Sequence, residues 1–586
     1  MIISNLKLAL IGTALAVILI ALGGCNFIPS NSTLNQLAPT PTFVLPPLAR
    51  VVDIEPDAVI IPIPIDPPSF NAYINDTGYE ELIGELVFGA LVEIGPDGEY
   101  YPELAVEVPT LENGSLSSDG LTVTWHLRPD VRWSDDEPFT SEDVRFTWEA
   151  LRQSGIFAPG FDLITDIETP DALTAVLSYS EFYPNYRLQF GGEGVGVFPA
   201  HQCGEPDQML LWDCNFDPIS TGPYVLAEWV PGERIIFNAN PNYWVPDRPL
   251  APQIVVLIEA DEEARQRLLE RGSAHLDLWV EEPQLTNLEA LPNVVIVPTN
   301  PARFVLRLVP NLSDFGTANV GQPHPILEDL NVRQAIRYAI NVPEINAQVF
   351  NNRGWQADTE LVRNGCTVPP YYYDPEQARA LLTEAGWIDE DGNGTRECHG
   401  CKNAADGTPL EMDSYYYVEF GPNLIAVHRR IELMLAAVGI NIHPKPVEGV
   451  DLWATWTDNG LEARGEFNLD LWDDGYFGID PTDYMYNLYD SQAIPTQHDP
   501  LAGFNVMRYR NPDLTDIFDQ LYQPLPDSLR TGYICELATI VHEDLPDIPL
   551  LALPDYYAIE RRLQGISPHI FDAITWNAAD WYLNSP

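Results

Sequence analysis

Segments with the pattern of a β-strand and segments with the periodicity of an α-helix follow one another along this chain, and that order constrains the fold most. The stretch IVVLIEADEEARQRLLERG at 254–272 begins as an apolar strand, places Asp261 at the expected N-cap of a helix and ends at Gly272. The apolar stretch HLDLWV follows directly as a second predicted strand. A strand, a helix and a strand in this order are the signature of a βαβ unit and indicate an α/β architecture.

The same kinds of signal recur in both halves of the chain. Residues 121–133 (LTVTWHLRPDVRW) alternate as a half-buried strand does, and Thr140 opens a T-x-x-D helix-capping pattern. In the second half, Asp329 and Asp374 stand at the N-caps of two predicted helices, the second of which ends at Gly386. A third predicted helix ends at Gly439, before the strand-like INIHPKPV.

The first 25 residues have the three parts of a secretory signal: the basic Lys7, an apolar core from Leu8 to Leu22, and small residues. The apolar core is shorter than the ~20 residues of a membrane-spanning helix. The sequence LGGC at 22–25 resembles the lipobox of bacterial lipoproteins, which implies that Cys25 is lipidated and becomes the new N-terminus. An uncut apolar anchor is the alternative reading.

Residues 26–49 are rich in Pro, Ser, Thr and Asn and lack apolar periodicity, which predicts an extended tether. The remainder of the chain is therefore expected outside the cytoplasm, held to the cell membrane by the N-terminal lipid, in the periplasm or on the outer cell surface.

Length and charge limit the classes of function. A chain of 586 residues is too long for one compact core, so two or more domains are expected. The formal net charge is −56, from 86 acidic and 30 basic residues spread along the chain. Such a surface repels phosphate backbones, so no nucleic-acid partner is expected. The negative charge either favours cationic ligands or keeps an exported protein soluble.

Six cysteines remain after Cys25, and an even number in an exported chain indicates disulfides. Cys203 and Cys214 are expected to close a short loop, whereas Cys366, Cys398, Cys401 and Cys535 allow three pairings. The CHGC at 398–401 lacks the second cysteine pair that zinc requires. It also has Lys402 where c-type haem attachment requires histidine, so a disulfide is favoured.

The sequence DEDGNG at 389–394 matches the first half of an EF-hand loop, with Asp389, Asp391 and Asn393 at the first three ligand positions. The acidic residue required at position 12 is replaced by Gly400. Calcium is thus one interpretation, and an ordinary tight turn is the other. No other cofactor is expected.

Nothing in the sequence indicates catalysis. The chain has no G-x-S-x-G elbow, no H-E-x-x-H, no P-loop and no dinucleotide-binding fingerprint. We therefore do not expect an enzyme.

Five stretches carry a family resemblance. They are Leu127-Arg128 with the following WSDDEPFTSEDVRFTWEAL, STGPYVLAEWVPGERIIFNANPNYW (220–244), LNVRQAIRYAIN (330–341), YDPEQARALLTEAGW with the DEDGNG turn, and LPDIPLLAL (545–553). In this order and spacing, the chain from about residue 51 to its C-terminus resembles the extracellular solute-binding proteins of family 5. These are the peptide and nickel type that deliver ligands to ABC importers.

The resemblance implies a two-lobed clamshell of the periplasmic-binding-protein type II, with an extra domain in the larger lobe. Lobe 1 is expected at 50–298, with the extra domain at about 86–215 and a return at 547–586. Lobe 2 is expected at 299–546. The two crossings, near 296–301 and 545–550, would form a hinge, and closure would trap a ligand. The implied partners are the permease subunits of an ABC importer, and the expected oligomeric state is a monomer.

Relatives that bind peptides hold the terminal ammonium with an aspartate in a segment that looks like LWDDGYFGIDPTDYMY (471–486). The resemblance therefore implies Asp474 as the first candidate and Asp473 as the second, with Trp472 and Tyr476 as walls of the site. On the alternative reading, the aspartates cap the end of a strand and the aromatic rings belong to the core.

The chain departs from the family pattern in places that leave the ligand open. Asn341 replaces the usual aspartate, residues 351–373 look shortened, and WSDDEP replaces a glycine-bearing turn. An oligopeptide or dipeptide is the expected ligand. A sugar, a metal chelate, a role as a cell-surface sensor, or a secreted hydrolase are the alternatives.

Overall fold

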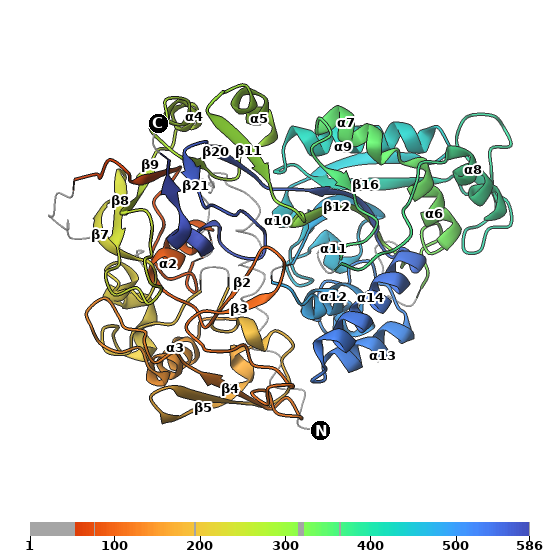
Figure 1. The fold of residues 1–586 in the computed structure, drawn as a ribbon. Coiled ribbons are helices and arrows are strands. Elements are labelled where there is room, and N and C mark those ends of the chain that lie inside the picture. The colour runs from red at the N-terminus through yellow and green to blue at the C-terminus, as the bar shows by residue number, and fades with distance from the viewer. Residues whose placement is uncertain are drawn as a thin grey trace, which may run out of the picture.

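The computed structural model describes residues 53–75, 77–192, 195–313, 322–361, 365–476 and 478–584. Two lobes lie side by side and are joined by two chain crossings (Figure 1). The signal segment, Cys25 and the tether lie outside the described residues. Among the described residues, no helix combines the length and the hydropathy needed to span a membrane.

Lobe 1 is built on a four-stranded mixed sheet with a smaller sheet beside it. The larger sheet has the order β1 (Val59–Ile63), β9 (Gln253–Ile258), β8 (Arg234–Ala239) and β7 (Tyr224–Val230). The smaller sheet has the order β10 (Leu276–Asp277), β20 (Tyr556–Glu560) and β11 (Val294–Pro298). The α-helices of this lobe are α2 (Tyr79–Val87), α4 (Glu262–Glu270) and α5 (Glu282–Glu289). The lobe also has two short two-stranded sheets, β2 (Val92–Ile94) with β3 (Tyr100–Pro102) and β21 (Leu563–Gln564) with β22 (Tyr582–Leu583).

Within 86–215, the range expected for the extra domain, a three-stranded antiparallel sheet and one long helix form a unit at the lower left of Figure 1. The sheet order is β4 (Thr122–His126), β6 (Thr174–Tyr179) and β5 (Ile164–Asp171), and the helix is α3 (Ser141–Ser154). Asp143 Oδ2 accepts the backbone N–H of Thr140 at 2.9 Å, as the capping pattern predicts. Buried residues of this unit, such as Trp125 and Trp148, belong to the same hydrophobic cluster as Ile254 of β9. The unit and the four-stranded sheet therefore share one core.

Lobe 2 is a six-stranded sheet between two layers of helices. The strand order is β13 (Trp355–Gln356), β19 (Ile548–Leu553), β12 (Phe304–Pro310), β18 (Leu469–Asp474), β16 (Glu411–Tyr417) and β17 (Asn441–Val447). Leu306 and Leu308 of β12 pack on the layer of α6 (Leu330–Ala339), α7 (Val342–Val349), α8 (Pro375–Glu384) and α9 (Pro422–Ala436). Val309 points to the other layer, α12 (Thr482–Tyr489), α13 (Pro512–Leu521) and α14 (Asp527–Asp544). The short elements are α10 (Gly449–Leu452), α11 (Leu461–Arg464), β14 (Trp387–Ile388) and β15 (Glu397–Cys398).

The predicted helix boundaries are confirmed by their caps. Asp261, Asp329 and Asp374 each accept a backbone N–H of the first helical turn. Gly386 and Gly439 have φ angles of 87° and 93°, in the region that favours glycine and ends a helix. The α/β class predicted from these signals is also confirmed.

The sequence pattern at 254–280 predicts a βαβ unit, but the structure does not have this unit within one sheet. β9 lies in the four-stranded sheet, whereas β10 pairs antiparallel with β20 in the smaller sheet. The second strand is only two residues long, because Trp279, at φ 47°, turns the chain out of extended conformation. The prediction was right about the elements and wrong about their shared sheet.

The chain returns to lobe 1 later than the expected residue 547. The apolar run of β19 at Ile548–Leu553 pairs with β12 in the centre of lobe 2. The chain then enters β20 of lobe 1 at Tyr556, so the second crossing lies at 554–555. The first crossing, between β11 and β12, lies at 299–303.

Three disulfides are present among the described residues. Cys203 pairs with Cys214, as predicted, with a Cα–Cα distance of 5.4 Å. Of the three pairings left open for the other four cysteines, the structure has Cys366–Cys535 and Cys398–Cys401. The first of these bridges links the segment before α8 to α14.

Candidate functional site

A buried arginine lies at the centre of lobe 2, on the strand that follows the first crossing. Arg307 of β12 is fully buried between β18 and β19. Its Nη2 donates to Asp474 Oδ2 at 2.7 Å and its Nη1 to Asp547 Oδ2 at 2.9 Å. The guanidinium carbon lies 4.6 Å from the ring centroid of Trp472. Arg307, in the middle of β12, thus joins the last residue of β18 to the residue that precedes β19.

The register of the sheet explains this arrangement. Arg307 stands opposite Trp472 in the antiparallel β12–β18 pair. Residues opposite each other project to the same face, and so does Asp474, two positions further along β18. Both candidate residues therefore meet the guanidinium on the face of the sheet that carries α12–α14.

Acidic groups outnumber the arginine in this cluster. Glu360 is 4% exposed, and burial raises the pKa of its carboxyl well above the usual range, while Arg307 acts in the opposite direction. Burial also raises the pKa of Asp474, again opposed by Arg307. One guanidinium therefore lies among the carboxyls of Asp474, Asp547 and Glu360. Such a cluster favours the arrival of a further positive charge.

Among these three carboxyls, Asp474 is the accessible one. Its side chain is 22% exposed, against 1% for Asp547. The hydroxyl of Tyr489 donates to Asp547 Oδ2 at 2.9 Å, so that carboxylate is held by the core.

The other two sequence candidates take separate positions around the end of β18. Asp473 projects to the opposite face of the sheet, where it accepts the hydroxyl of Tyr417 at 2.8 Å. Tyr476 is 5% exposed, and its ring centroid lies 5.3 Å from that of Tyr484. The structure brings Asp474 and Trp472 together on Arg307 and leaves Asp473 and Tyr476 outside that contact. A role of the four in ligand binding stays a prediction.

Two cavities lie between the lobes. One, of about 160 Å³, is lined from lobe 1 by Tyr100 and Arg187 and from lobe 2 by Asp480, Asp527 and Arg530, among others. The other, of about 720 Å³, lies between residues of the extra domain and residues near α12, including Asp483. None of the four sequence candidates lines either cavity, but Ile479 and Asp480 of the same segment line the first.

Ion pairs border the first cavity. Arg187 Nη2 of lobe 1 donates to Asp527 Oδ1 of lobe 2 at 2.9 Å, and within lobe 2 Arg530 Nη1 donates to Asp480 Oδ2 at 2.9 Å. Arg187, Asp527 and Arg530 stand in segments without a recognisable motif, so the sequence did not point to them. Asp480 lies in the segment 471–486 that the family resemblance singled out, but it was not among the four candidates. Arg307 did carry a signal: an arginine inside the apolar strand FVLRLVP predicts a buried ion pair.

A second pair of buried carboxyls lies on the same face of β18. Asp470 is fully buried beside Glu462, which is 4% exposed. Burial raises the pKa of Asp470 to about 7 and that of Glu462 well above the usual range. The two acidic groups therefore share protons at neutral pH.

Asp470→Asn is expected to flatten the pH dependence of folding stability. The folded-state pKa lies above the ordinary value of 3.8, so the wild-type protein loses stability as pH rises through about 7 and the buried carboxyl ionises. Between pH 5 and pH 8, the free energy of unfolding of the variant should change by about 1–3 kcal/mol less than that of wild type. Urea unfolding at both pH values measures this difference. Asp166→Asn, on an exposed position of β5, is the control, and equal pH slopes for the two variants would contradict the prediction.

The DEDGNG loop forms a compact exposed turn. Asp389 Oδ1 accepts the backbone N–H groups of Gly392 at 2.8 Å and Asn393 at 3.1 Å, and its Oδ2 accepts that of Gly394 at 3.1 Å. Oxygens of Asp389, Asp391 and Glu397 lie within 4.8 Å of one another. Because these bonds also describe an ordinary turn, calcium in this loop stays a prediction.

Comparison with known proteins identifies relatives of this chain by sequence. A model of the bacterial extracellular solute-binding proteins, family 5, matches residues 99–496, more than half of the chain. A putative ABC transporter peptide-binding protein of Brucella ovis is 28% identical over 76% of this chain and 80% of its own length.

Solved structures show the same fold at low sequence identity. HbpA2 from Haemophilus parasuis superposes with a TM-score of 0.72 at 18% identity and covers 90% of this chain and 100% of its own. NikA from Brucella suis, solved in complex with Fe(III)-EDTA, has a TM-score of 0.67 at 20% identity, with 88% and 98% covered. The two-lobed α/β architecture is therefore shared with these structures.

Proposed function

Since this chain belongs to the bacterial extracellular solute-binding proteins of family 5, we propose that it captures a short peptide between its lobes and delivers it to an ABC importer. Membership of this family implies that the protein acts outside the cytoplasm and delivers its ligand to an ABC importer. The peptide is our proposal, supported by the name of the Brucella relatives and by the charges of the site.

The acidic surplus around Arg307 carries this proposal. A peptide presents an ammonium group at one end, and a carboxylate that is partly withdrawn from water binds it more strongly than one at the surface. Asp474 offers such a carboxylate, 22% exposed, beside a cluster in which acidic groups outnumber the guanidinium. We assign the ammonium to Asp474, with Trp472 as the neighbouring wall.

Contacts across the lobes support closure as the capture step. Arg187–Asp527 joins the lobes beside the first cavity, and Arg353 of lobe 2 pairs with Glu282 and Glu289 of lobe 1 at 2.6 Å and 2.8 Å. The crossings at 299–303 and 554–555 are the only two covalent links between the lobes within the described ranges. Two short links permit a hinge motion, and closed lobes would present one surface to the permease.

The N-terminal segment is proposed to anchor the protein near its importer. Lipidation at Cys25 would hold the monomeric body to the cell membrane, and residues 26–49 would let it reach the permease. This part rests on the sequence alone.

A metal chelate is the second candidate ligand. NikA, which shares the fold, was solved with Fe(III)-EDTA, an anionic chelate. The arginines of the first cavity, Arg187 and Arg530, would suit such a ligand, although both are already paired with aspartates. The acidic surplus at Asp474 favours the peptide.

Asp474→Asn is expected to weaken the binding of peptides with a free N-terminus by about 30-fold or more, because the ammonium loses its carboxylate partner. Titration calorimetry with a tetrapeptide and its N-acetylated form measures this. Wild type should bind the acetylated form more weakly by a similar factor, whereas the variant should not distinguish the two.

Asp473→Asn is the matched control, since its side chain projects to the other face of the sheet. It should discriminate between the two peptides as wild type does. Full discrimination by Asp474→Asn, or its loss in Asp473→Asn alone, would contradict the assignment.

A further inference from the structure

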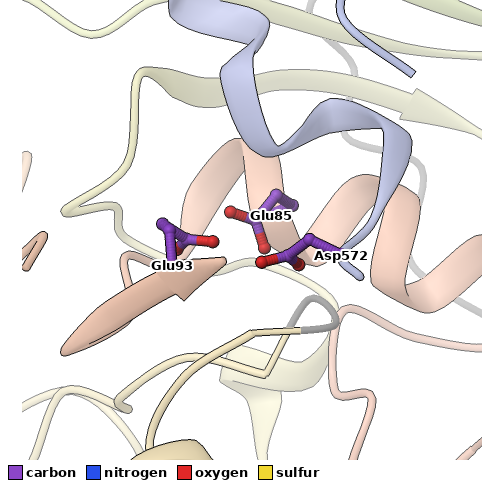
Figure 2. Close-up of side chains that lie close together, drawn as sticks. All are labelled: Glu85, Glu93 and Asp572. Atoms are coloured by element: carbon purple, nitrogen blue, oxygen red, sulfur yellow. The ribbon is translucent and has the colours of Figure 1, made fainter. Parts of the chain in front are cut away.

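Three buried carboxylates from distant parts of the sequence meet inside lobe 1. Glu85 comes from α2, Glu93 from β2, and Asp572 from the C-terminal return, just before the 3₁₀ helix η7 (Ile574–Asp580). Figure 2 shows the three side chains pointing toward one another. One oxygen of each lies within 4.8 Å of the others, and the residues are 7%, 7% and 2% exposed.

Neither carboxylate oxygen of Glu93 accepts a hydrogen bond from an N–H or a hydroxyl group in the described structure. Burial raises the pKa of Glu93 well above its usual range, and the neighbouring acidic groups Glu85, Asp572 and Glu103 raise it further. A buried carboxylate in such surroundings requires a proton or a cation. This distinguishes the cluster from the one in lobe 2, where Arg307 supplies the positive charge.

Backbone groups fix the positions of the surrounding carboxylates. Asp572 accepts the N–H of Ala573 at 2.8 Å and that of Ile94 at 3.3 Å, and Glu103 accepts the N–H of Ala90 at 2.6 Å. These backbone bonds hold the carboxylates of Asp572 and Glu103 in place, and the side chain of Glu93 points toward the space between its acidic neighbours.

We propose that Glu85, Glu93 and Asp572 bind a divalent cation of the Ca²⁺ type. Ca²⁺ takes carboxylate oxygens at 2.3–2.6 Å, so two ligands of one ion lie no more than about 5 Å apart. The cluster offers only oxygen ligands, which suits a hard cation and disfavours zinc or copper. Glu103 stands close enough to add to the negative charge.

The ion would link three segments of lobe 1 close to the place where this lobe contacts lobe 2. Ile94 and Phe571, the sequence neighbours of two ligands, form a small hydrophobic cluster with Ile570, against which Ile479 of lobe 2 packs. A cation at the carboxylates would thus fix β2, α2 and the C-terminal return behind this contact. The site does not depend on which solute the protein carries.

The test is calcium binding by the protein after treatment with EDTA and dialysis. Titration calorimetry should show one saturable Ca²⁺ site that survives in the double variant Asp389→Asn, Asp391→Asn, which removes the exposed loop's carboxylates. CaCl₂ should raise the thermal midpoint of that variant, and NaCl at the same ionic strength should not. Glu93→Gln in the same background should weaken the site at least tenfold.

Unchanged Ca²⁺ affinity in a folded Glu93→Gln variant would contradict the proposal, and two further results would overturn it. The first is loss of all Ca²⁺ binding in the double variant, which would place the ion in the exposed loop. The second is no Ca²⁺ binding by any form, which would mean that shared protons satisfy the buried cluster. Because the double variant changes only exposed side chains, both results can be read even if Glu93→Gln fails to fold.

Discussion

Replacing Arg307 by methionine is expected to lower the free energy of unfolding by about 3–5 kcal/mol, because the substitution leaves buried carboxylates without their positive partner. Asp547 is 1% exposed and Asp474 is 22% exposed, so neither is well hydrated once the guanidinium is gone. Methionine keeps much of the volume, which limits the contribution of a cavity to the measured effect. Urea unfolding at pH 8 gives the free-energy difference.

The effect should shrink as pH falls. Burial already raises the pKa values of Asp474 and Glu360 against the opposing effect of Arg307. Without the guanidinium these two folded-state pKa values rise further, so the folded protein takes up protons that the unfolded chain does not. The variant should therefore recover part of its lost stability at pH 5.

Arg145→Met is the matched control for this experiment. Arg145 forms a surface pair with Glu142, in which the side chains are 42% and 49% exposed, and its loss should cost less than about 1 kcal/mol. If Arg307→Met cost no more than Arg145→Met, the buried network would not hold the sheet together.

Loss of the Cys366–Cys535 disulfide is expected to cost about 4–5 kcal/mol in the chain-entropy account, because the bridge closes a loop across a sequence separation of 169. The double variant Cys366→Ser, Cys535→Ser measures it by urea unfolding. The bridge ties the segment before α8 to α14, so the variant should also expose this segment to proteolysis sooner.

The bridge Cys398–Cys401 provides the control. Its sequence separation is only 3, so the same account assigns it about 1–2 kcal/mol. Equal losses for the two double variants would show that loop length does not set the stabilisation here.

Local features of the fold were readable from the sequence, because they depend on neighbouring residues. Asp261, Asp329 and Asp374 cap their helices, since an aspartate before an apolar-periodic segment satisfies backbone N–H groups within the same few residues. The pair Cys203–Cys214 closes a loop short enough to predict.

Sheet membership and the remaining disulfides were not readable in this way. The strand after α4 pairs with β20, some 280 residues later in the sequence by the register Leu276–Ile559, and no local pattern specifies such a partner. The second crossing was placed too early, because the apolar run 548–553 looks the same whichever lobe it enters.

The candidate site was predicted in part. The family resemblance pointed to the segment that contains Asp474 and Trp472, and the structure brings both onto Arg307. It could not show which of the adjacent residues Asp473 and Asp474 meets Arg307, because that depends on the register of β18 with β12. The sequence also could not predict the buried carboxylate cluster of lobe 1, because its parts come together only in the folded chain. The backbone N–H of Ile94, for example, donates to Asp572 across a sequence separation of 478.

Native mass spectrometry of residues 50–586, purified from cells grown in peptide-rich medium, tests the central claim most directly. Gentle ionisation should show the protein with added masses, and denaturation should release a mixed set of short peptides with free N-termini. That mixture is the predicted result, since a site built around the ammonium group tolerates different side chains. A single non-peptide solute, or a protein that neither retains nor gains any peptide, would contradict it.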